Sequence, residues 1–285
     1  MTFSSDILVG RLAWYAYSNA DFLVAGRILG RAALGLYELG WMLANIPIDR
    51  ITALVTQVTP SVFSAVQRDH AALRRYLLGI SEGLALITFP ASLGIALVAP
   101  DLVLLTLGDK WHGAIAPLQL LALSTAFRAV TPLLPQVLNA VGETRLAMRY
   151  GVVCALVLPP GFYFLGKQWG TVGIALVWVC VFPILVLPAY RRVLETIELP
   201  IREYLRALWP AASASLLMAA AVLAVKLTAG AHMSRGVSFG AQVVAGAVVY
   251  TLTCLTLHGE RVASFLRALR AMRAPPRPAG EASTS

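Results

Sequence analysis

A stripe of polar side chains runs through an otherwise apolar segment, residues 34–64. Its Asn, Thr and acidic members recur mainly at steps of three and four residues, and they are Glu38, Asn45, Asp49, Thr52, Thr56 and Thr59, with Arg50 beside Asp49. Such steps place side chains on one face of an α-helix. Polar groups at membrane depth are costly and usually face protein or water. The pattern therefore predicts a membrane-spanning helix that borders a water-filled cavity.

Two other apolar segments carry similar lines of polar residues. Near the amino terminus the line contains Arg11, Tyr15 and Ser18, flanked by Asn19 and Asp21. In residues 115–140 a second line is interrupted by prolines, and it consists of Ser124, Arg128, Thr131 and Asn139. An arginine at the centre of a membrane helix costs about 3 kcal/mol of free energy on insertion scales. It is therefore unfavourable for these polar stripes to face the lipid.

We therefore expect the three polar segments to face a common cavity, with Arg11, Arg50 and Arg128 making it positive. Guanidinium groups match phosphate oxygens well, so such a cavity suits an anionic substrate. Two structural alternatives remain open. The arginines could snorkel toward the ends of their spans, or Asp49 and Arg50 could pair locally.

The composition is that of an integral membrane protein. The chain has 285 residues, of which 58% are hydrophobic and only 13% charged, and its mean hydropathy is +0.74. Soluble domains contain about 25% charged residues, and no polar stretch here is long enough to form one. The cysteines, Cys154, Cys180 and Cys254, are scattered in apolar runs, which argues against a disulfide framework or a zinc site. We expect an all-α polytopic bundle without a soluble domain, a metal or a cofactor.

The number of spans follows from the thickness of the bilayer. A hydrocarbon core of about 30 Å requires about 20 mostly apolar helical residues. On that rule the predicted spans are 7–26, 34–64, 77–99, 115–140, 146–166, 171–190, 207–227 and 238–258. Eight spans would place both termini on the same side of the membrane.

The basic residues predict which side that is. The loops after the second, fourth and sixth spans, together with the carboxy-terminal segment, contain Arg68, Arg74, Arg75, Arg145, Arg149, Arg191, Arg192, Arg202, Arg206, Arg261, Arg267, Arg270, Arg273 and Arg277. The opposite loops contain fewer, namely Arg27, Arg31, Lys110, Lys167, Lys226 and Arg235. Cytoplasmic loops are enriched in such residues, so both termini are predicted to be cytoplasmic. The net charge of +9 is then a topology signal and does not indicate nucleic-acid binding.

The carboxy-terminal segment has two predicted parts. Residues 261–273 alternate apolar residues and arginines at helical spacing, which indicates an amphipathic helix on the cytoplasmic lipid headgroups. A helix that is simply solvated is the alternative. Residues 274–285 are rich in Pro, Gly and Ser and are predicted to be disordered.

Two sequence patches resemble a known family. The first lies in residues 18–47 and contains Asn19, Asp21, Gly26, Arg27, Leu29, Gly30, Leu34, Gly35 and Tyr37; the second contains Gly108, Lys110 and Trp111. In this order they resemble the carboxy-terminal half of oligosaccharide-lipid flippases, in the polysaccharide-transporter family of the multidrug/oligosaccharidyl-lipid/polysaccharide exporter superfamily. The rhythm of spans is similar from about residue 5 to residue 258.

The resemblance implies a transporter that is not an enzyme. It would flip undecaprenyl-pyrophosphate-linked oligosaccharide across the bacterial inner membrane by alternating access, for O-antigen, capsule or exopolysaccharide synthesis. Lipid-linked oligosaccharide, membrane lipids and other polysaccharide-assembly proteins are the implied partners. The cavity residues expected from the polar lines are Arg11, Tyr15, Asn19, Asp21, Asn45, Asp49, Arg50, Thr52, Thr56, Arg128 and Asn139.

The chain departs from this family in its number of spans. Family members usually have twelve to fourteen, arranged as two six-helix lobes. Here residues 1–195 would form the second lobe and 196–260 two trailing helices, with the first lobe absent. We expect a truncated product or a start assigned too late, with a separate chain that supplies the first lobe as the remaining alternative.

Two other functions fit the sequence less well. A multidrug or cation exporter of the same superfamily would have a cavity dominated by acidic and aromatic groups, whereas the acidic candidates Asp21, Glu38 and Asp49 are matched by arginines. A membrane-embedded glycan-modifying enzyme would need acid and base groups at a membrane face. The four histidines are scattered and have no paired carboxylate in the sequence, so no catalytic residue is predicted.

Overall fold

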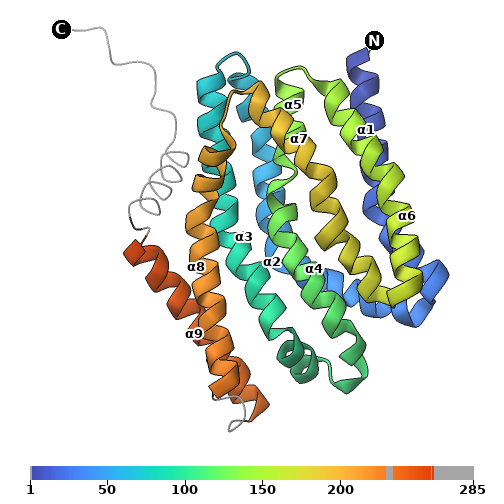
Figure 1. Ribbon diagram of the computed structural model, residues 1–285, viewed down its shortest axis with the longest axis vertical. Helices are drawn as coiled ribbons and strands as arrows, with labels where there is room; N and C mark the ends of the chain where they lie inside the picture. The colour runs from blue at the N-terminus through green and yellow to red at the C-terminus, as the bar shows by residue number, and fades with distance from the viewer. Residues whose placement is uncertain (1, 229–233, 258, 260–285) are drawn as a thin grey trace, which may run out of the picture.

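The computed structural model describes residues 2–228, 234–257 and 259, and these are helical apart from short connections (Figure 1). The helices are α1 (Thr2–Val24), α2 (Arg31–Ala65), α3 (His70–Thr106), α4 (Ile115–Val130), α5 (Leu133–Ala140), α6 (Thr144–Leu176), α7 (Phe182–Thr196), α8 (Ile201–Thr228) and α9 (Arg235–Leu257). Two π-helical turns, η1 (Ala25–Leu29) and η3 (Val177–Val181), and a 3₁₀ turn, η2 (Asp109–Ala114), complete the order. The predicted amphipathic helix 261–273 and tail 274–285 lie outside the described residues.

The prediction of an all-α membrane bundle is confirmed. Among the described residues, five helical stretches are long and apolar enough to cross a bilayer: His70–Thr106, Asp109–Ala140, Thr144–Thr196, Ile201–Thr228 and Arg235–Leu257. Each of the eight predicted spans lies largely within helix. The number eight itself stays a prediction, because α1 and α2 carry the polar stripes and are less apolar than these five stretches.

The stretch Thr144–Thr196 is folded back on itself. As one straight helix its 53 residues would extend about 80 Å, more than twice the bilayer core. Trp169 and Gly170 leave the helical conformation, and Gly170 has φ +61°. The chain reverses there, so that α6 and α7 run side by side in opposite directions (Figure 1). This bend separates the two predicted spans 146–166 and 171–190.

Glycines let several helices approach closely. α1 packs chiefly against α6, where a Cβ on Gly151 would lie 3.4 Å from the carbonyl oxygen of Gly10. α2 packs against α4, where a Cβ on Gly40 would lie 3.2 Å from the backbone nitrogen of Leu118. Close backbone approach of this kind is a common basis of helix association in membranes. The polar helices α1, α2 and α4 are therefore held in one bundle.

The pair α8 and α9 forms one edge of the molecule, packed against α3 (Figure 1). Polar contacts fix α9 there: Gln242 Nε2 donates to Asp101 Oδ2 at 2.9 Å, and the Tyr250 hydroxyl donates to the carbonyl of Leu86. The division into a lobe at 1–195 and trailing helices at 196–260 stays a prediction.

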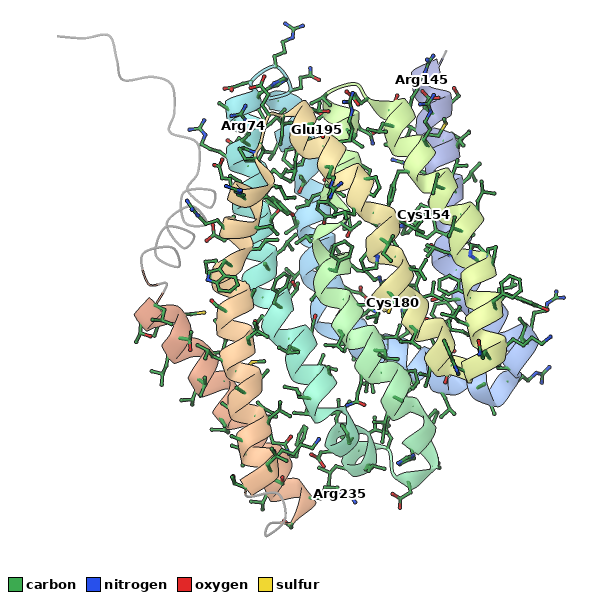
Figure 2. The ribbon with its side chains drawn as sticks, viewed as in Figure 1. Arg74, Arg145, Cys154, Cys180, Glu195 and Arg235 are labelled. Atoms are coloured by element: carbon green, nitrogen blue, oxygen red, sulfur yellow. The ribbon has the colours of Figure 1, made fainter. Side chains whose placement is uncertain are left out.

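One end of the bundle gathers the turns that the sequence predicts to be cytoplasmic. α1 begins there, and the α2–α3, α5–α6 and α7–α8 connections lie there, with Arg74, Arg145 and Glu195 labelled in Figure 2. Salt bridges join these turns: Arg74 to Glu198 at 2.7 Å, and Arg192 to Glu143 at 3.7 Å. Arg235 lies at the opposite end (Figure 2). The turns that the sequence predicts to be cytoplasmic thus gather at one end of a single bundle.

Candidate functional site

Asp21 is the centre of a buried polar cluster. It lies near the end of α1 with 0% of its surface exposed. One carboxylate oxygen accepts hydrogen bonds from the Tyr37 hydroxyl at 2.9 Å and from Trp178 Nε1 at 3.0 Å. The other accepts from the backbone N–H of Phe22 at 2.9 Å. A buried carboxylate needs such donors because its charge is otherwise unsolvated. The cluster therefore ties α1 to α2 and η3.

Arg128, on α4, lies in the angle between two tryptophan rings. Its Cζ is 4.1 Å from the centroid of the Trp41 ring and 4.7 Å from that of Trp178. The two indoles themselves are 5.6 Å apart and tilted by 55°. Cations within about 6 Å of an indole centroid are attracted by the ring quadrupole. Trp178 thus touches both charges of the site, because it also donates to Asp21.

More rings surround this pair of charges. Phe22 meets Trp41 edge-on at 5.4 Å, and Phe162 and Phe182 flank Trp178 at 5.4 Å and 5.2 Å. Aromatic pairs in this distance range are favourable by about 0.5–1.5 kcal/mol beyond their burial. The aromatic packing fixes the position of the guanidinium and leaves it little freedom to snorkel.

The Arg128 guanidinium retains hydrogen-bonding capacity. Its Nη1 is buried and has no hydrogen-bond partner among the residues that the structure describes. A buried unpaired charge is strongly destabilising, and cation–π contacts replace only part of its hydration. A planar guanidinium with free N–H groups matches the oxygens of a phosphate or carboxylate. These unpaired N–H groups make Arg128 the candidate partner for an anionic group.

Some predicted site residues lie on helices that carry this cluster or pack against it. Asn45, 5% exposed, donates to the carbonyl of Trp41 at 2.8 Å. Thr52 is half-buried further along α2, and Asn139 is half-buried on α5. α2 packs directly on both α4 and α5. The structure thus places polar residues of the second and fourth predicted spans on adjoining helices.

Other predicted site residues lie on the surface of the described chain. Arg11, Tyr15 and Asn19 form an exposed row on α1, and Asp49 is exposed on α2. The amide of Asn19 donates to the carbonyl of Tyr15 at 2.8 Å. The side chains of Arg50 and Thr56 are outside what the structure describes. The cavity role of all these residues stays a prediction.

The aromatic residues of the site were not predicted as site residues. Tyr37 is a position of the first motif patch, and no sequence pattern described above includes Trp41. Their spacing carried a signal, because Tyr37, Trp41 and Asn45 recur every four residues and share one helical face. Trp178 lies in an apolar run with no such pattern. Only the fold brings it to Asp21 and Arg128.

The sequence matches known proteins over part of its length. A family model described as "Polysaccharide biosynthesis protein" matches residues 1–116. An "Uncharacterized membrane protein in cps region" of Klebsiella pneumoniae is 30% identical over 62% of this chain and 36% of its own length. The "Lipopolysaccharide biosynthesis protein WzxC" of Escherichia coli is 28% identical over 68% of this chain and 40% of its own. The "Teichuronic acid biosynthesis protein TuaB" of Bacillus subtilis is 32% identical over 50% and 29%. The matched region is therefore well under half the length of each relative.

The fold is also that of a solved transporter structure. "Lipid II flippase MurJ, inward closed conformation" aligns with a TM-score of 0.66 and 14% identity, over 89% of this chain and 53% of the other. At that identity the likeness concerns the fold alone. The sequence matches and the fold agree with the resemblance found in the two motif patches. The chain is thus similar in sequence to membrane proteins of polysaccharide biosynthesis, over part of their length, and similar in fold to a lipid II flippase.

Proposed function

We propose that the chain forms one lobe of a flippase for lipid-linked oligosaccharide in the bacterial inner membrane, with Arg128 as the anchor for the pyrophosphate. The observation that carries the proposal is the buried Nη1 of Arg128, which has no partner in the described part of the chain and belongs to a guanidinium held against two indoles. The named functions of the relatives, in lipopolysaccharide and teichuronic acid biosynthesis, support a polysaccharide substrate.

Pyrophosphate fits this position for a chemical reason. The linkage between carrier lipid and sugar is the most strongly anionic part of such a substrate, and water must be removed from it during transfer. Guanidinium groups bind phosphate oxygens through two parallel hydrogen bonds. The negative charge of Asp21 offsets the positive charge of Arg128 when the substrate is absent. Because the arginine is already partly neutralised, its affinity for the pyrophosphate is moderate, which permits release on the far side of the membrane.

The exposed polar row on α1 is an argument that a second lobe packs beside this one. Arg11 and Asn19 are exposed, and Tyr15 is 66% exposed, on a helix that crosses or borders the membrane. An arginine facing acyl chains is costly. A cavity between this lobe and another would keep the row in water and next to the sugar. The chain spans 29–40% of the length of its relatives, so the other lobe and alternating access are part of this proposal.

We also propose that the arginine-rich end faces the cytoplasm and that both termini lie there. Arg74 and Arg145 lie at one end of the bundle (Figure 2), and Arg192 forms a salt bridge to Glu143 in the α5–α6 connection at that end. Basic residues in short loops near spans favour the cytoplasmic side. In that orientation substrate would enter from the end at which α1 begins.

The test of the function compares two substitutions of one residue. Arg128→Ala and Arg128→Lys are placed in a protein that carries both lobes, and surface polysaccharide is measured in cells lacking their own flippase. We expect Arg128→Ala to lower output by about tenfold or more, as expected for a lost charge-assisted contact. Arg128→Lys should recover only part of it, because an ammonium cannot bind in bidentate fashion.

The matched control is Arg191→Ala, which removes an exposed arginine at the end of the bundle. It should leave output unchanged. Equal polysaccharide output from the parent protein and Arg128→Ala, at equal expression, would contradict the proposed role.

A further inference from the structure

A groove opens between α3 and α8 near the arginine-rich end, away from the Asp21–Arg128 cluster. Its volume is about 520 Å³, and it is lined by Leu78, Glu82, Pro200, Arg202, Glu203, Arg206 and Ala207. Sites for small molecules usually measure about 300–1,000 Å³. The groove is thus large enough for a polar headgroup with the first atoms of its lipid tails.

The walls of the groove are fixed by contacts between distant parts of the chain. The Tyr204 hydroxyl lies 3.3 Å from Ser81 Oγ, which joins α8 to α3. Arg74 on α3 donates to the carbonyl of Ile197 and pairs with Glu198 at 2.7 Å, in the turn before α8. A groove held in this way exists before any ligand binds, so little ordering opposes binding.

The charges in the groove are mixed and balanced. Arg202 and Arg206 are four residues apart and therefore lie on one face of α8. Glu203 comes from the same helix and Glu82 from α3. Two guanidinium groups and two carboxylates have no formal net charge together. Such a site suits a zwitterion. A purely anionic headgroup would be attracted by the arginines but repelled by the carboxylates.

Exposed aromatic residues indicate the depth of the groove in the membrane. Trp209 on α8 is 61% exposed, and Tyr76 on α3 is 43% exposed. Exposed Trp and Tyr concentrate at the level of lipid headgroups. Leu78 and Ala207 offer apolar contacts beside the charges. The groove therefore lies where a headgroup meets its acyl chains.

We propose that this groove binds the headgroup of phosphatidylethanolamine from the leaflet at the arginine-rich end. The phosphate accepts hydrogen bonds from Arg202 and Arg206, and the primary ammonium donates to Glu82 and Glu203. Phosphatidylcholine carries the same charges, but its quaternary nitrogen has no N–H to donate. Phosphatidylglycerol has the phosphate and no ammonium. The site is independent of the transport proposal, because it needs only a membrane location.

Native mass spectrometry of the purified chain with the three lipids, at matched acyl chains, tests the proposal. Phosphatidylethanolamine should bind about tenfold more tightly than either other lipid, since only it offers both a phosphate to the arginines and N–H donors to the carboxylates. The double variant Arg202→Gln/Arg206→Gln should lose that preference. Glu203→Gln, a change of one exposed side chain, should reduce it and serves if the double variant does not fold.

Arg191→Gln is the matched control, because Arg191 is exposed at the same end but does not line the groove. It should keep the full preference. Equal affinity for the three lipids, tightest binding of phosphatidylglycerol, or an unchanged preference in folded Glu203→Gln would each overturn the proposal. Because the readout is lipid binding, those results would leave the flippase proposal untouched.

Discussion

At the scale of single residues, the site depends on Trp178, because this side chain contacts both an acidic and a basic group. The indole N–H donates to Asp21, while the ring lies 4.7 Å from Arg128. Asp21 in turn keeps Tyr37 and Trp178 oriented. The charges are thus held near each other through an aromatic bridge. Such an arrangement keeps Arg128 in place while its Nη1 makes no hydrogen bond to any described residue.

Trp178→Phe should separate these two roles. Phenylalanine keeps an aromatic face near Arg128 but removes the donor to Asp21, so a buried carboxylate loses one of its three hydrogen bonds. We expect a loss of about 1–2 kcal/mol of stability, read as a fall of roughly 2–8 °C in the thermal unfolding midpoint in detergent.

Trp209→Phe is the control for that variant, because Trp209 is a tryptophan with 61% of its surface exposed. Its unfolding midpoint should stay within about 1 °C of the parent, since exposed substitutions rarely exceed 0.5 kcal/mol. Equal unfolding midpoints for Trp178→Phe and Trp209→Phe would show that the hydrogen bond from Trp178 to Asp21 contributes nothing to stability.

At the scale of elements, the reversal between α6 and α7 decides where Trp178 lies. Gly170 takes φ +61°, a conformation that residues with a Cβ rarely adopt. Gly173 packs so tightly into the reversal that a Cβ there would overlap the carbonyl oxygen of Leu165. The first π-helical turn follows α1 and the second contains Trp178. Such turns are frequent at functional sites, and here both lie next to the charged cluster.

Gly173→Ala should therefore damage the fold at the reversal. The obstructing atom belongs to the backbone and cannot rotate away, so we expect a destabilisation of at least about 2 kcal/mol, within the range of overpacking. Thermal unfolding and the yield of monodisperse protein in detergent would measure it.

The comparison is Gly79→Ala on α3, where an added Cβ would meet no atom within 4 Å. Alanine favours helix over glycine by up to about 1 kcal/mol, so this variant should be neutral or stabilised. If the two alanine variants behaved alike, the tight reversal would be ruled out.

At the scale of the whole molecule, the two ends of the bundle differ in charge and its two edges differ in composition. The arginine-rich turns collect at one end, and η2 and Arg235 lie at the other (Figure 2). The bundle is asymmetric, with α8 and α9 at one edge and the exposed polar row of α1 at the opposite edge (Figure 1). That asymmetry leaves the α1 side available for a second lobe.

Cysteine labelling tests the proposed orientation. In a version without Cys154, Cys180 and Cys254, Arg68→Cys and Asp109→Cys place single thiols at opposite ends of the bundle. A membrane-impermeant maleimide added to spheroplasts should label Asp109→Cys, whereas Arg68→Cys should react only after permeabilisation. The reverse pattern would place the arginine-rich end outside the cytoplasm.

The sequence by itself determined the class of the molecule, since an apolar composition with helical spacing can be satisfied in a bilayer only by spanning helices. It also singled out Asp21, Asn45 and Arg128, because a polar residue in an apolar helix is conspicuous along the chain. Which of them meet depended on tertiary structure. Asp21 and Trp178 are 157 positions apart, and no local periodicity encodes a contact made by the reversal at Gly170. The same holds for the groove at Arg206, which exists only because α3 and α8 pack together.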